Sequence, residues 1–112
     1  MRTSTATRRL VIVESPYAGD IERNVAYARA CIADCIRRGE APFASHLIYT
    51  QPGVLDDADA RERRLGIDLG LAWGSRADLV AFYVDLGWSN GMKAARTFWE
   101  EHGKVVEVRR TE

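Results

Sequence analysis

The segment LVIVESPYAGD, residues 10–20, decides the fold of this chain. Its first part, residues 10–14, is a continuous apolar and β-branched run that ends at a Pro/Gly loop, as is typical of a strand buried on both faces. Asp20 then supplies an N-cap for a helix predicted over residues 20–38, where apolar side chains recur at helical spacing until Gly39. The segment therefore predicts a strand followed directly by an amphipathic helix.

The rest of the chain continues this alternation of strands and helices. The remaining predicted elements are a short strand that runs into a loop over 42–49, a helix from Asp57 or Asp59 to Gly74, a strand over 78–84, a helix over 90–102 and a strand over 104–109. This order, with short links, predicts a single-domain α/β three-layer sandwich with a mostly parallel sheet of four to five strands. We expect a flexible tail over residues 1–8 and the domain over residues 9–110.

The helix predicted to end at Gly74 has two faces, and either of them could pack against the rest of the protein. An apolar stripe is formed by Leu65, Leu69, Ala72 and Trp73. Gly66 and Gly70 form a second, smooth face, and glycine inside a helix costs about 1 kcal/mol relative to alanine. We expect the stripe to face the core and the glycines to allow close approach of a neighbouring backbone, in the same chain or in another subunit.

Composition limits the function classes. The 112 residues carry 16 Lys+Arg and 16 Asp+Glu, so no basic excess exists to drive binding along a nucleic-acid backbone. No apolar run approaches the roughly 20 residues that span a bilayer, and the first residues lack a signal-peptide core, so we expect a cytosolic protein. Cys31 and Cys35 are four apart in a helical pattern, which suits a disulfide poorly, and we expect both to be reduced and buried.

Polar side chains gather in the loops that follow the first three predicted strands. In an open parallel sheet, ligands bind beyond the carboxyl ends of the strands. These loops contain Glu14, Ser15, Tyr17, Gly19 and Asp20; His46, Tyr49 and Gln51; and Asp85, Gly87, Trp88, Ser89, Asn90, Gly91 and Met92. Single members have simpler explanations as turn or cap residues, but their concentration at one edge predicts a site for a small polar ligand.

Two further polar residues lie at the borders of predicted buried faces. At 100° per residue, Asn24 lies about 60° from the apolar stripe of its helix, and Asp68 lies about 60° from Leu65. Asp68 must hold a backbone amide, pair with an arginine or bind a ligand hydroxyl, because an unpaired buried carboxylate is costly. No spacing resembles a metal-ligand set, and we expect neither a metal nor a cofactor. A phosphate, if bound, would meet the amides of residues 89–91.

These residues also carry a resemblance to a known family. The chain resembles small domains allied to the nucleoside 2-deoxyribosyltransferases, often found in phages, over about residues 10–109. The motifs that carry the resemblance are residues 14–20, Asn24, Gly39, Pro42, residues 45–47, residues 67–69, residues 77–80 and residues 85–92. The resemblance implies a flavodoxin-like or Rossmann-like fold in the cytoplasm of a bacterium or of a phage-infected host.

The resemblance also implies a pocket for a nucleoside or nucleotide, with Asp68 and Asp85 holding sugar hydroxyls. It implies a homodimer or higher homo-oligomer in which a neighbouring subunit often completes the site. In the transferases, a glutamate four residues after the loop glycine attacks the anomeric carbon. Here the position four residues after Gly91 is Ala95, so the usual nucleophile is absent.

Three accounts of function follow. In the first, an enzyme cleaves or transfers at an N-glycosidic bond: Glu14 or Asp85 stabilises the oxocarbenium-like centre or activates water, and His46 protonates the leaving base. Trp88 would stack on that base, or it would simply pack in the core or at a subunit interface. In the second, the pocket binds a nucleotide without catalysis. In the third, the chain is a structural subunit that has lost the ligand. The expected substrate-binding residues are Ser15, Tyr17, Gly19, Asn24, Asp68, Gly87, Trp88, Ser89, Gly91 and Met92.

Overall fold

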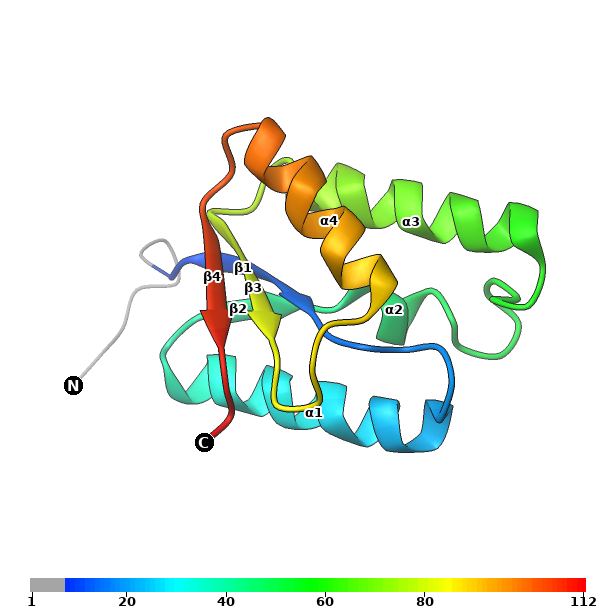
Figure 1. Ribbon diagram of the computed structural model, residues 1–112, viewed down its shortest axis with the longest axis horizontal. Helices are drawn as coiled ribbons and strands as arrows, with labels where there is room; N and C mark the ends of the chain where they lie inside the picture. The colour runs from blue at the N-terminus through cyan, green and yellow to red at the C-terminus, as the bar shows by residue number, and fades with distance from the viewer. Residues whose placement is uncertain (1–7) are drawn as a thin grey trace.

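A four-stranded, all-parallel sheet in the order β2-β1-β3-β4 forms the centre of the protein (Figure 1). The structure is a computed structural model and describes residues 8–112. Its elements are β1 (Leu10–Glu14), α1 (Ile21–Arg37), β2 (Ala41–Phe43), α2 (Ser45–Ile48), α3 (Ala60–Gly74), β3 (Leu79–Tyr83), α4 (Asn90–Glu101) and β4 (Val106–Arg109). The predicted α/β class and parallel sheet are confirmed.

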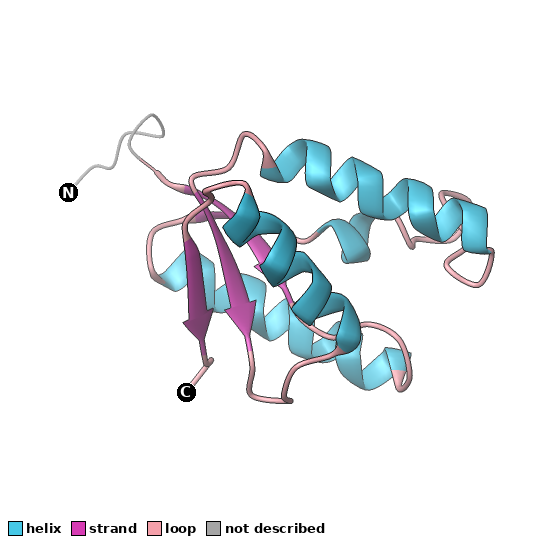
Figure 2. Ribbon diagram, turned by 45° about the horizontal axis from the view of Figure 1, so that its top comes forward, coloured by secondary structure: helices cyan, strands magenta, loops and turns pink. Residues whose placement is uncertain are grey.

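The helices cover both faces of the sheet, with α1 on one side and α3 and α4 on the other (Figure 2). Alternate residues of β3 supply the two cores because successive side chains of a strand point to opposite faces. Tyr83 packs with Cys31 and Cys35 on the α1 side, whereas Phe82 packs with Met92 on the α4 side. Both cysteines are buried and reduced, as predicted.

The prediction for residues 42–49, a short strand that runs into a loop, misses a helical turn. The strand β2 pairs with β1 through three residues only and ends at Phe43. Ser45–Ile48 then form one helical turn, in which the amide of Tyr49 donates to the carbonyl of Ser45 at 2.9 Å. The turn moves His46 off the line of the strand and towards the loop that follows β1, where its ring meets Ser15.

The apolar stripe of α3 does not face the core as predicted, whereas its glycines do allow close approach of a neighbour. The glycine face packs inward: a Cβ at Gly70 would lie 2.7 Å from Ser45 Oγ, and a Cβ at Gly74 would lie 2.3 Å from the ring of Trp99. The stripe expected in the core is instead largely outside, with Leu65 48% and Trp73 55% exposed. Of the two readings of the glycines, close approach within the same chain is therefore the one observed.

This geometry predicts opposite effects for two alanine substitutions in α3. Gly74→Ala would place a methyl against the buried Trp99 ring and should lower the free energy of unfolding by about 1–3 kcal/mol. Gly66→Ala is the matched control: its Cβ would meet only Leu55, at an ordinary 3.4 Å. The gain in helix propensity should make Gly66→Ala more stable by up to about 1 kcal/mol. Urea unfolding of both variants tests this, and equal effects would contradict the packing.

The predicted N-terminal tail, residues 1–8, lies outside the described residues except for Arg8. That side chain donates from Nη1 to the carbonyl of Gly39 at 3.0 Å. Within the described residues, no helix has the length and apolar character needed to cross a membrane.

Candidate functional site

A cavity of about 570 Å³ opens beyond the carboxyl end of β1. It is bounded by the loop that follows β1, by α2, by the glycine face of α3 and by the first turns of α4. Its volume lies within the roughly 300–1,000 Å³ of typical small-molecule sites. The closely packed glycines thus bring α3 near the sheet edge at which the sequence predicts a ligand.

Seven of the predicted site residues line this cavity. They are Glu14, Ser15, Tyr17, His46, Ser89, Gly91 and Met92. Ala95, the residue four positions after Gly91, also lines it. The strand-end rule therefore finds the loop after β1 and the start of α4 correctly.

Glu14 is a carboxyl group that lines the cavity and belongs to the sheet. It is the last residue of β1 and pairs with Phe82 of β3, so its backbone is fixed by the sheet. Its carboxyl forms no hydrogen bond or ion pair with any other residue in the range 8–112. Burial raises the pKa of Glu14 from 4.5 to about 7. At neutral pH the group is therefore present in both its protonated and its ionised form.

His46 is held beside the same cavity in its neutral form. Its Nε2 lies 3.0 Å from Ser15 Oγ, and the ring of Tyr17 meets the imidazole edge-on at a centroid distance of 6.0 Å. Burial lowers the pKa of His46 from 6.5 to about 4. An imidazole that is uncharged at pH 7 is a poor acid, so the predicted role of His46 in protonating a leaving base does not suit its surroundings. Glu14 suits that role better.

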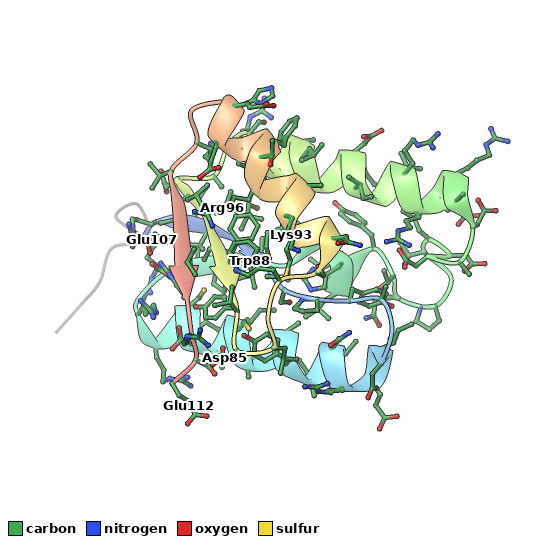
Figure 3. The ribbon with its side chains drawn as sticks, viewed as in Figure 1. Asp85, Trp88, Lys93, Arg96, Glu107 and Glu112 are labelled. Atoms are coloured by element: carbon green, nitrogen blue, oxygen red, sulfur yellow. The ribbon has the colours of Figure 1, made fainter. Side chains whose placement is uncertain are left out.

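The structure places Asp85 outside the cavity. Its carboxylate accepts a hydrogen bond from Tyr27 Oη at 2.5 Å and another from the amide of Thr111 at 3.0 Å, near the C-terminal end of the chain (Figure 3). Burial alone would raise its pKa, but these hydrogen bonds outweigh that effect and hold the pKa of Asp85 below its usual value. Asp85 therefore anchors the C-terminal segment and is not available to a ligand in the cavity.

Asp68 and Asn24 also lie away from the cavity lining. Asp68 is exposed on the outer face of α3, because the inward face is the glycine face. Asn24 is buried, and its Nδ2 donates to the carbonyls of Tyr17 at 2.9 Å and Ala18 at 3.0 Å. The interpretation of Asp68 as a buried ligand group is therefore not supported, whereas Asn24 holds the loop that carries Tyr17.

The other three predicted binding residues shape the loops without lining the cavity. Gly19 and Gly87 have φ angles of 98° and 87°, which favour glycine at these turns. The ring of Trp88 lies on Phe82 with centroids 5.2 Å apart, and the guanidinium of Arg96 lies 5.1 Å from the Trp88 ring (Figure 3). Trp88 is thus partly buried against the core on the α4 side, and core packing was one of the three alternatives for it.

Sequence reasoning missed the side chains that α2, α3 and the link between them contribute. These include Ser45, Thr50, Asp57, Glu62 and Arg63. One signal was present in the sequence: Arg63 precedes Gly66 by three residues and Gly70 by seven, which places all three on one helix face. If the glycine face is the inward face of the helix, this spacing predicts that Arg63 also points inward.

Comparisons with known proteins identify a family but not an activity. The sequence profile of the family described as Domain of unknown function (DUF7768) matches residues 9–109, nearly the whole chain. Among curated proteins, none matches this chain. Within residues 8–112, no three His, Cys, Asp or Glu side chains cluster as metal ligands would.

Proposed function

The chain belongs to this family of domains of unknown function, and we propose that it hydrolyses the N-glycosidic bond of a nucleoside or nucleotide in the cavity at Glu14. The observation that carries the proposal is the carboxyl of Glu14, which has no hydrogen-bond or ion-pair partner within residues 8–112 and whose pKa of about 7 suits proton transfer at neutral pH. The resemblance to the nucleoside 2-deoxyribosyltransferases supports the choice of substrate.

Glu14 has two uses in such a reaction. Protonated, it donates to the nitrogen of the departing base; ionised, it accepts a proton from the attacking water or stabilises the positive charge that develops at the anomeric carbon. Ala95 presents only a methyl group where the transferases carry a nucleophilic glutamate. Water is therefore the acceptor that we propose, and a covalent glycosyl-enzyme does not form at this position.

A second candidate function is binding of a nucleotide without catalysis. Two observations favour it: Ala95 stands where the resemblance places the transferase nucleophile, and the N-terminus of α4 opens on the cavity near Ser89 and Gly91. Amides at a helix start favour an anion such as a phosphate group, and Arg63 of α3 lines the same cavity. The third account, a structural subunit, would leave the cavity without a ligand.

A panel of nucleosides and nucleoside 5′-monophosphates tests these accounts. We expect chromatography to detect release of free base from at least one compound, and Glu14→Gln to lower the rate at least about 100-fold. Asp68→Asn, which changes an exposed carboxyl on the outer face of α3, is the comparison variant. An equal loss in Asp68→Asn would support the sequence-based assignment of Asp68 and contradict the role of the cavity.

The same panel separates the alternatives. Thermal shifts without base release would favour the binding function, because a ligand at 100 times its dissociation constant adds roughly 2.7 kcal/mol to stability. Absence of both base release and thermal shift would contradict both functions and favour the structural subunit.

A further inference from the structure

We propose that Ser15 and His46 form a nucleophile–base pair, and that the cavity has a second activity: acyl transfer from small carboxylic esters to water through an acyl-Ser15 intermediate. This activity uses atoms other than the Glu14 carboxyl and does not rest on the glycosidic function.

The pairing of the two side chains is the first observation. Ser15 follows β1 directly, is 6% exposed and lies with its Oγ 3.0 Å from His46 Nε2, within the reach of a nucleophile and its base. In the tautomer that carries its proton on Nδ1, Nε2 accepts the hydrogen bond from the Ser15 hydroxyl. Burial keeps the imidazole unprotonated at neutral pH, so its lone pair is free to take the proton.

Three of the other hydroxyl groups that line the cavity are engaged differently. Ser89 Oγ accepts from the amide of Met92 as the N-cap of α4, and Thr50 Oγ1 donates to the carbonyl of His46. Tyr49 Oη accepts from Trp73 Nε1 at 2.8 Å. Among the hydroxyls that line the cavity within residues 8–112, Ser15 is the one hydrogen-bonded to an imidazole.

The cavity also holds groups that suit an ester. The first amides of a helix have no partner within it, and Asn90 and Gly91, the first two residues of α4, both line the cavity. Backbone amides of this kind stabilise the oxyanion of a tetrahedral intermediate. Ile67, Leu71 and Phe98 supply apolar wall for a short acyl chain. Nucleophile, base, amides and acyl site thus share one cavity.

The reaction balances with water as the single co-reactant. Ser15 Oγ bonds to the ester carbonyl carbon while its proton moves to His46 Nε2. The ester C–O bond then breaks, and that proton passes to the leaving alkoxide, which departs as an alcohol. Water attacks the acyl-Ser15 carbon, His46 takes a proton from it and returns the proton to Ser15 Oγ, and the carboxylic acid leaves.

A fluorophosphonate probe tests the nucleophile without any ester substrate. The Ser15 oxygen displaces fluoride from phosphorus, and mass spectrometry of the full chain locates the adduct. We expect one adduct, on Ser15, and at least a tenfold slower labelling in His46→Gln. Ser45→Ala removes another cavity hydroxyl and should label at the normal rate. Release of 4-nitrophenol from 4-nitrophenyl acetate should decline in parallel with labelling in Ser15→Ala and His46→Gln.

The outcomes separate this proposal from the glycosidic one. An adduct on Ser45 or Ser89, or no adduct on a folded protein, would overturn the acyl-transfer proposal whatever the nucleoside panel gives. Ser15→Thr, which keeps a hydroxyl, serves if Ser15→Ala does not fold. Labelling of Ser15→Thr should depend on His46. If the Ser15→Thr/His46→Gln double variant is labelled as fast as Ser15→Thr, the assignment of His46 as the base is overturned.

Discussion

Glu40→Gln is expected to lower the free energy of unfolding by about 3–5 kcal/mol. The Glu40 carboxylate forms two parallel contacts with Arg109, from Oε1 to Nη1 at 2.7 Å and from Oε2 to Nη2 at 2.8 Å. Both residues are buried, with 6% and 5% exposure. The hydrogen bond from Arg109 holds the pKa of Glu40 below its usual value. Removing the charge of Glu40 leaves the partly exposed carboxylate of Glu107 as the one anionic partner of the buried guanidinium within residues 8–112.

An exposed ion pair of the same chain provides the control. Arg96 Nε and Glu100 Oε2 are 3.2 Å apart on α4, with side chains 42% and 53% exposed. Glu100→Gln should change stability by no more than about 0.5 kcal/mol, because water screens such pairs. Chemical denaturation measures both variants, and equal small losses would show that the buried pair contributes no more than the exposed one.

A charge-free double variant separates the cost of an unpaired charge from the value of the pair. In Glu40→Met/Arg109→Met neither charge remains buried, and much of the lost stability should return. The pair joins the end of β4 to the segment between α1 and β2, so its loss affects contacts that are 69 residues apart in sequence. A double variant as unstable as Glu40→Gln would mean that the shape of the pair, and not its charge, is what the fold needs.

Elements with strong local signals were predictable from the sequence. The apolar run of β1 gives that strand with its correct ends, and the predicted caps Asp20 and Asp59 begin α1 and α3. The prediction for residues 44–48 was wrong because a single helical turn is too short to show the repeating spacing of apolar residues by which a helix is recognised in a sequence. The prediction of which face of α3 points inward was wrong because it followed the apolar stripe. The glycines pack against Ser45 and Trp99, which lie far away along the chain, so the sequence near α3 does not show that the glycine face is the inward one.

The candidate site was predictable to the level of the sheet edge and no further. The strand-end rule placed Glu14 and His46 at one cavity, but it says nothing about the direction in which a loop side chain points. Asp85 follows β3 as expected, yet it turns to Tyr27 and Thr111, partners 58 and 26 residues away. Such partners leave no periodic signal in a sequence. The homo-oligomer expected from the resemblance stays a prediction.

Glu14→Gln is expected to make the protein more stable by about 3 kcal/mol at pH 8 while removing its proposed activity. The pKa of Glu14 is about 7 in the folded protein and 4.5 without the shift that burial causes. Below pH 4.5 the group is protonated in both the folded and the unfolded state. As the pH rises from 4.5 to 7 the unfolded chain releases its proton first, so stability falls, and above pH 7 the full difference of about 3 kcal/mol persists.

Titration of His46 changes the stability with pH in the opposite direction to titration of Glu14. The quantity to measure is therefore the difference in stability between wild type and Glu14→Gln. The pKa of His46 falls from 6.5 to about 4 on burial, so the stability that His46 contributes is present above pH 6.5 and is lost as the pH falls through 4. Both proteins contain His46, and its effect cancels in the difference. The gap between Glu14→Gln and wild type should be smallest near pH 4.5 and should grow to about 3 kcal/mol by pH 8. A gap that does not change with pH would show that the carboxyl of Glu14 is not held in a desolvated state. If the stability difference grows with pH and Glu14→Gln also loses base release, then the Glu14 carboxyl is needed for the reaction and weakens the fold at neutral pH.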